Sequence, residues 1–92
     1  MQIKKVDSNQ RMIVTNLRKI PNLSVFCTHM VGKGFPDIVV GYKGRNYLFE
    51  IKDGSKAESQ RKLTIAEHSF FMNWRGQVNV ANSIDDILKI IN

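Results

Sequence analysis

The chain has 92 residues, 42% of them hydrophobic, which is enough for one small folded domain, residues 1–92, and argues against a disordered tail. No apolar run has the length of a membrane span, and the N-terminal segment lacks the apolar stretch of a signal peptide, so we expect no membrane partner. Lysine and arginine number 14 against 8 acidic residues, and the net charge of +6 favours a polyanionic partner, most often nucleic acid. The single cysteine, Cys27, cannot form an internal disulfide, so we expect a reducing, cytoplasmic location.

The first predicted element is a helix over residues 8–20. Its apolar residues Ile13, Leu17 and Ile20 follow helical spacing, and Ser8 is a suitable N-cap. The Pro-Asn pair that comes next predicts the end of the helix.

Three strands are predicted to follow. Residues 23–30 are rich in β-branched and aromatic side chains, which is typical of a strand. Residues 37–42 and 46–52 are two further strands, and the glycine between them predicts a tight hairpin turn.

The last part of the chain predicts a helix over residues 60–75, ended by Gly76, and a short strand over residues 77–81. Ser83 is a suitable cap for a final helix, whose first turn holds two aspartates. The predicted order is α-β-β-β-α-β-α.

The most apolar strands carry charged residues, which need an explanation because burying a charge is costly unless it is paired or bound to a metal. Strand side chains alternate between faces, so Glu50 and Lys52 share the face opposite Phe49 and Ile51. Asp37 opens the neighbouring strand, and the hairpin is expected to pair it close to Lys52 and to bring it near Glu50. Two nearby carboxylates attract a cation, and oxygen ligands suit Mg²⁺ or Mn²⁺. Such an ion beside a lysine is suited to phosphodiester hydrolysis.

The spacing of these three residues alone also fits a second interpretation. Glu50 and Lys52 could belong to an array of ion pairs on a solvated strand face, since structural charge networks are common. Without further context the pattern favours that interpretation.

A longer pattern supplies the context. The Pro36-Asp37 pair followed by Glu50-Ile51-Lys52 resembles the signature of the PD-(D/E)XK nuclease superfamily. Further similarity to its small, stand-alone phage and bacterial VRR-NUC branch covers nearly the whole chain. It is carried by residues 32–38, 63–76 and 80–88, and the predicted order of elements also fits.

The resemblance implies an α/β fold with a restriction-endonuclease-like αβββαβ core, in which helices flank a central mixed four-stranded sheet. It implies that Asp37 and Glu50 hold Mg²⁺ or Mn²⁺, with the main-chain carbonyl of Ile51 as a third ligand, and that Lys52 acts on the attacking water. It further implies cutting of branched DNA such as a four-way (Holliday) junction, action as a homodimer, and a place in a bacterial or phage-infected cell.

Glu67 falls on the apolar side of the helix predicted over residues 60–75. The family often has a polar residue near this point that faces the active site, which makes Glu67 a candidate catalytic residue, in the metal shell or orienting Lys52. The alternative is an acid near the helix start, where the helix dipole favours it and solvent is in reach.

The first helix departs from the family pattern. The superfamily frequently places an acid there, turned towards the metal, whereas this chain has Asn9 and Gln10. Weaker metal binding is one implication, and a contact of Gln10 through water is another. Capping and plain solvation are the simpler interpretations for both residues.

Six basic residues near the predicted site are candidates for contacts with the DNA backbone. For each of them a mobile surface position is an equally good interpretation. They are Lys33, Lys43, Arg45, Lys56, Arg61 and Lys62.

Three functions therefore compete. The first is a metal-dependent endonuclease for branched DNA. The second is a basic DNA-binding module that keeps the nuclease fold but does not cut, which the missing first-helix acid favours and the intact acids oppose. The third is a nuclease subunit that needs a partner for targeting.

Overall fold

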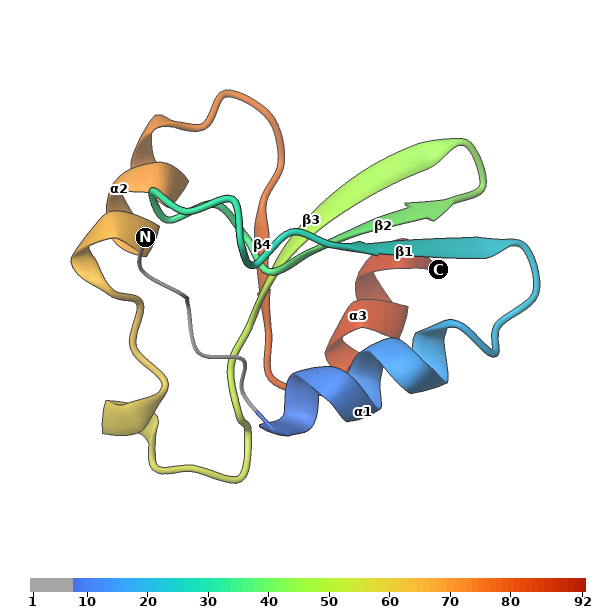
Figure 1. The fold of residues 1–92 in the computed structure, drawn as a ribbon, viewed down its shortest axis with the longest axis horizontal. Coiled ribbons are helices and arrows are strands. Elements are labelled where there is room, and N and C mark those ends of the chain that lie inside the picture. The colour runs from blue at the N-terminus through green and yellow to red at the C-terminus, as the bar shows by residue number, and fades with distance from the viewer. Residues whose placement is uncertain (1–7) are drawn as a thin grey trace.

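The computed structural model describes residues 8–92. Figure 1 shows their arrangement: a twisted sheet with helices beside it. The elements are α1 (Ser8–Leu17), β1 (Leu23–Cys27), β2 (Ile38–Tyr42), β3 (Arg45–Ile51), a 3₁₀ turn (Glu58–Gln60), α2 (Ile65–Asn73), β4 (Asn79–Ala81) and α3 (Ile84–Ile91). The predicted order of helices and strands is confirmed. Because α1 begins at the first described residue, its capping arrangement lies outside the described residues.

The sheet is mixed and has the strand order β1-β2-β3-β4. The first three strands are antiparallel neighbours, and β4 runs parallel to β3 after the crossover through α2. The hairpin between β2 and β3 closes with the pair Tyr42 and Arg45. Its two turn residues, Lys43 and Gly44, have φ values of 52° and 77°, as a two-residue type I′ turn requires.

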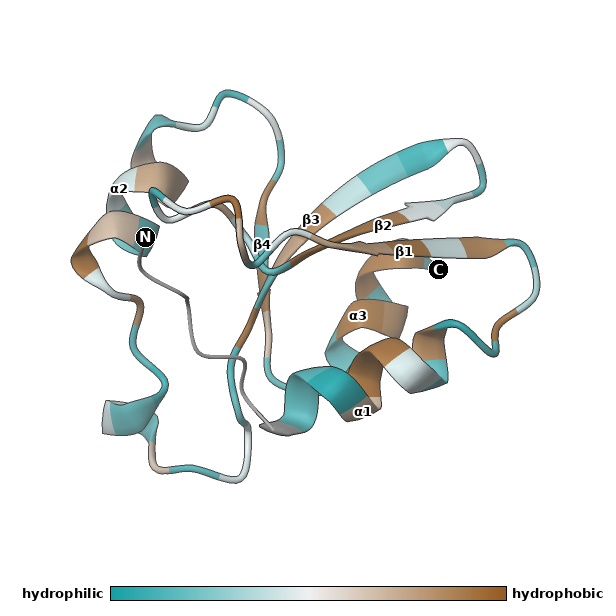
Figure 2. Ribbon diagram, in the orientation of Figure 1, coloured by the Kyte–Doolittle hydropathy of each residue, from teal (hydrophilic) through white to brown (hydrophobic). Residues whose placement is uncertain are grey.

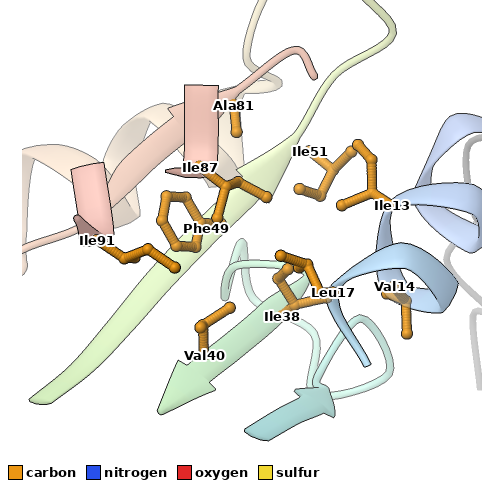
Figure 3. Close-up of a cluster of buried hydrophobic side chains, with 10 residues drawn as sticks. All are labelled: Ile13, Val14, Leu17, Ile38, Val40, Phe49, Ile51, Ala81, Ile87 and Ile91. Carbon is orange, nitrogen blue, oxygen red and sulfur yellow. The ribbon is translucent and has the colours of Figure 1, made fainter. Parts of the chain in front are cut away.

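The core lies between one face of the sheet and the pair of helices α1 and α3 (Figure 1). Leu17, Phe49 and Ile87 are fully buried there, and Figure 3 shows how side chains from both helices meet those of β2, β3 and β4. In Figure 2, hydrophobic residues are concentrated in α1, α3 and the strands between which this core lies, whereas the segment after β3 is hydrophilic. Among residues 8–92, no helix has the length and apolar character needed to cross a membrane.

Helix α2 lies apart from α1 and α3, near the end of the sheet where β2 begins (Figure 1). It is attached to the loop before β2 by an aromatic cluster, in which the ring of Phe70 lies 5.3 Å from Phe35 and 5.0 Å from Trp74. The predicted start of this helix near residue 60 was wrong. Thr64 caps it, so that α2 begins at Ile65 and is shorter than expected.

Candidate functional site

Strand β3 sends Phe49 and Ile51 into the core and Glu50 to the opposite face, as the alternation predicted. The exposed fraction of Glu50 is only 1%, which excludes a solvated strand face at this position. Glu50 is paired in the sheet with Val80 of β4. A fully buried carboxylate on an inner strand needs compensation by hydrogen bonds, an ion pair or a metal.

Asp37 lies just before β2, and its exposed fraction is 3%. Its N–H donates to the carbonyl of Phe49 at 2.9 Å. Phe49 is also the residue that lies opposite Ile38 in the sheet. Asp37 and the first residue of β2 thus both oppose Phe49 of β3, which is the pairing of a β-bulge at the strand end. The bulge places the Asp37 carboxylate against the main chain of β3, where Oδ2 accepts the N–H of Ile51 at 2.8 Å.

This register corrects the predicted pairing of Asp37 with Lys52. Asp37 meets β3 at Phe49 and Ile51, on either side of Glu50, and not at Lys52. The hairpin closes with the pair Tyr42 and Arg45, so the regular register already carries Asp37 to the level of Glu50, two residues before Lys52. The two acids are nevertheless brought to neighbouring positions on adjacent strands.

The main chain at the end of β3 presents oxygen atoms to this region. In a strand, the N–H and C=O of one residue point towards the same neighbour, so the Ile51 carbonyl faces the side on which Asp37 lies. The Lys52 carbonyl accepts the side-chain amide of Asn9 at 2.8 Å. Helix α1 therefore fixes the chain at the point where β3 ends.

Lys52 and Glu67 form an ion pair, with Nζ 2.8 Å from Oε1, and the two side chains are 12% and 4% exposed. The same Glu67 oxygen accepts the N–H of Thr64 at 2.9 Å, and the Thr64 hydroxyl accepts the N–H of Glu67 at 3.2 Å. This is a capping box at the start of α2. Glu67 lies in the first turn of the helix and contacts Lys52, but it does not reach solvent, which corrects that part of the second interpretation. Its catalytic role stays a prediction.

The loop before β2 permits this approach of α2. Gly32, Lys33 and Gly34 all have positive φ, at 86°, 56° and 79°. A Cβ atom on Gly34 would lie 2.1 Å from the main-chain oxygen of Ala66 in α2. Only glycine leaves room for the helix at this distance, so Gly34 helps to set the position of Glu67.

The six predicted DNA-contacting residues do not form one group. Lys43 and Arg45 lie at the hairpin turn, about 20 Å along the strands from Asp37, and Lys43 covers the ring of Tyr42. The other four residues belong to two segments that lie towards the end of the sheet near α2 (Figure 1). These segments are the loop with Lys33 and the stretch after β3 with Lys56, Arg61 and Lys62. Of the latter, Lys56 and Lys62 are exposed and Arg61 is half-buried.

The predicted metal ligands provide a small donor set. Within the described part of the chain, no three side chains of the His, Cys, Asp or Glu type are grouped to hold an ion. Asp37 and Glu50 are two buried carboxylates, and the Ile51 carbonyl adds a main-chain oxygen. This oxygen-only set fits a hard cation such as Mg²⁺, which keeps several of its own waters.

Sequence reasoning missed the roles of Thr64 and Asn9. The Thr-x-x-Glu spacing is the signature of a capping box and could have revealed Thr64. Asn9 contacts Lys52 across 43 residues of sequence, and no local signal indicates this. Neither Asn9 nor Gln10 is simply solvated, because Asn9 is half-buried and Gln10 is buried.

The fold and the buried charges define a mixed α/β protein with two carboxylates and an ion-paired lysine where β2 begins and β3 ends. No family model, no curated protein and no solved structure matches this chain. The nuclease resemblance therefore depends on the motif residues and their placement alone.

Proposed function

We propose that the protein is a metal-dependent endonuclease of the PD-(D/E)XK type, with a restriction-endonuclease-like fold, which hydrolyses phosphodiester bonds of DNA. The observation that supports it most is the placement of Asp37, Glu50 and Lys52 within one small region, all largely shielded from water. A protein that needed these residues for solubility alone would expose them.

Each residue has a role in this proposal. Asp37, Glu50 and the Ile51 carbonyl would hold Mg²⁺ or Mn²⁺, which supplies Lewis-acid stabilisation of the phosphate and lowers the pKa of water. Lys52 would donate hydrogen bonds to the scissile phosphate or the water. An ammonium group has three donors, so the ion pair with Glu67 does not exhaust them. Glu67 would fix the direction of the lysine and neutralise its charge before DNA binds.

The substrate in this proposal is branched DNA, such as a four-way junction. A symmetric junction requires two matched cuts, which a homodimer with two-fold symmetry would provide. Lys33, Lys56 and Lys62 are exposed near the proposed site and would contact phosphates, as would the half-buried Arg61. Lys43 and Arg45 would act only on a duplex that follows the hairpin. Sedimentation of the pure protein, with and without junction DNA, would give the oligomeric state.

One observation favours a second function. The first helix offers Asn9 and Gln10 where the superfamily frequently has an acid. A basic module that binds DNA without cutting would tolerate this loss, as would a nuclease subunit activated by a partner. Buried acids oppose the module, since carboxylates that face phosphate weaken binding.

A cleavage assay separates these functions. Labelled four-way junction and linear duplex are incubated with pure protein in Mg²⁺, Mn²⁺ or EDTA, beside Asp37→Asn, Lys52→Ala and the control Lys19→Ala on the exposed turn after α1. We expect metal-dependent cutting, reduced at least about a hundredfold by the first two changes and unaltered by the control. Binding without cutting would favour the module. Cutting that survives both substitutions would contradict the proposed site.

A further inference from the structure

A cavity of about 570 Å³ lies beside the end of β3, between the first helix and the start of the last one. This volume is within the range of small-molecule sites and can hold a single nucleoside. Amide side chains and apolar side chains share its lining. The lining includes Asn9, Met12, Asn16, Arg61, Asn82 and Ile84.

The lining has hydrogen-bonding capacity that no other part of residues 8–92 uses. Asn9 Oδ1 and Arg61 Nε are both buried, and neither has a hydrogen-bond partner among the described residues. Asn16 and Asn82 add two amides, and each amide both donates and accepts. Paired donors and acceptors on one group are what reading the edge of a nucleobase requires.

The charge of the cavity disfavours an anion. Asp53 and Asp86 also line it, against the single arginine. Oδ1 of Asp53 accepts the hydroxyl of Ser55 at 2.6 Å and its N–H at 2.9 Å. Oδ2 of Asp86 accepts the N–H of Asn82 at 2.8 Å. A cavity with two carboxylates and one guanidinium would repel a phosphate and accept an uncharged heterocycle.

The cavity is connected to the proposed catalytic site through Asn9. Its amide lines the cavity and donates to the carbonyl of Lys52 at 2.8 Å. Asp53, which follows Lys52 in the chain, also lines the cavity. Lys52 therefore contacts the cavity residue Asn9 through its main-chain carbonyl and Glu67 through its side chain, which links the cavity to the end of β3 that carries the proposed site.

We propose that the cavity is a nucleobase-binding subsite, which receives a base turned out of the DNA stack next to the phosphate that is cut. This inference deepens the nuclease proposal and depends on it for the position of the phosphate. Met12 and Ile84 would cover the faces of the base, and the asparagines would contact its edge. Unstacking a base costs a few kcal/mol in a duplex and less where bases are already unpaired, so the subsite would favour branch points.

The test uses the full chain without metal, so that no cutting occurs. The ¹⁵N-labelled protein is titrated with each uncharged 2′-deoxynucleoside, and with 2-deoxyribose and inorganic phosphate as controls. We expect the side-chain amide signals of Asn16 and Asn82 to shift with nucleosides at a Kd of about 1 mM, and to stay in place with both controls. Equal shifts with either control, or no shift with any nucleoside, would overturn the inference.

Two variants of α1 test whether binding takes place in the cavity. Asn16→Ala keeps α1 folded, because alanine has the highest helix propensity, and should weaken deoxynucleoside binding about tenfold. Thr15→Ala, the exposed neighbouring position on the same helix, should leave it unchanged. Unaltered binding by Asn16→Ala would reject the subsite. Because this readout needs neither metal nor cleavage, its failure is distinguishable from failure of the proposed nuclease activity.

Discussion

Lys52, the first residue after β3, and Glu67 of α2 are joined by a contact of 2.8 Å between Nζ and Oε1. That single carboxylate oxygen also accepts the N–H of Thr64, which begins the helix. The direction of the Lys52 ammonium therefore depends on where α2 starts. A helix that began one turn earlier would carry its acid elsewhere and leave the lysine without this partner.

Glu67→Gln should lower the free energy of unfolding by about 3 kcal/mol, because it leaves a largely buried ammonium beside an uncharged amide. Urea denaturation at neutral pH measures this change. The matched control is Glu58→Gln on the exposed 3₁₀ turn, which should stay within about 0.5 kcal/mol of wild type.

The double variant Lys52→Met with Glu67→Gln tests whether the unpaired lysine charge causes the loss of stability. Replacing both charges by neutral groups of similar size should restore much of the lost stability, since the penalty arises from the unpaired charge. If the double variant were as unstable as the sum of the two single variants, the ion pair would not be the origin of the loss.

Gly34→Ala should destabilise the protein and reduce DNA cutting together. The new methyl group would lie 2.1 Å from the main-chain oxygen of Ala66 and would displace α2, which holds Glu67. Gly32→Ala is the matched control, because Gly32 also has positive φ but has nothing within 4 Å of the added atom. We expect a cost of about 1 kcal/mol for Gly32→Ala and clearly more for Gly34→Ala, measured by thermal unfolding. Equal losses would show that backbone strain, and not the contact with α2, limits this loop.

The exposed lysines after β3 should contribute more to DNA binding than the basic residues of the hairpin turn. Lys56→Ala with Lys62→Ala removes two charges near the proposed site, and Lys43→Ala with Arg45→Ala removes two at the far end of the hairpin. If the first pair contacts phosphates, the slope of log K against log salt should fall by about 2 for that variant only. Fluorescence anisotropy with junction DNA in EDTA gives both slopes, and equal effects would place the DNA along the hairpin.

The order of elements and the core face of β3 could be predicted because both depend on local periodicity. Alternation placed Phe49 in the core and Glu50 opposite, and Gly44 indicated the hairpin turn. These features require no knowledge of what packs against the strand.

The details of the site could not be predicted because they depend on contacts between distant segments. The bulge at Asp37 adds one residue to the pairing, and no residue in the hairpin requires it locally. The start of α2 was wrong because apolar spacing was extended through residues 61–64, although the capping signal lies within them. The contact of Asn9 with Lys52 depends on how α1 packs across the end of the sheet.

Mn²⁺ should raise the thermal stability of the wild-type protein, because an ion held by the native site stabilises only the folded state. At a free concentration of 100 times its Kd the gain is about 2.7 kcal/mol, and EDTA should abolish it. Asp37→Asn keeps an oxygen that can accept the N–H of Ile51 but loses the charge. Mn²⁺ should therefore no longer raise the thermal stability of this variant. Asp85→Asn removes an exposed acid from the first turn of α3 and should retain the full gain. The same Mn²⁺-dependent rise in Asp37→Asn and wild type would place the ion elsewhere and contradict the role given to the two buried carboxylates.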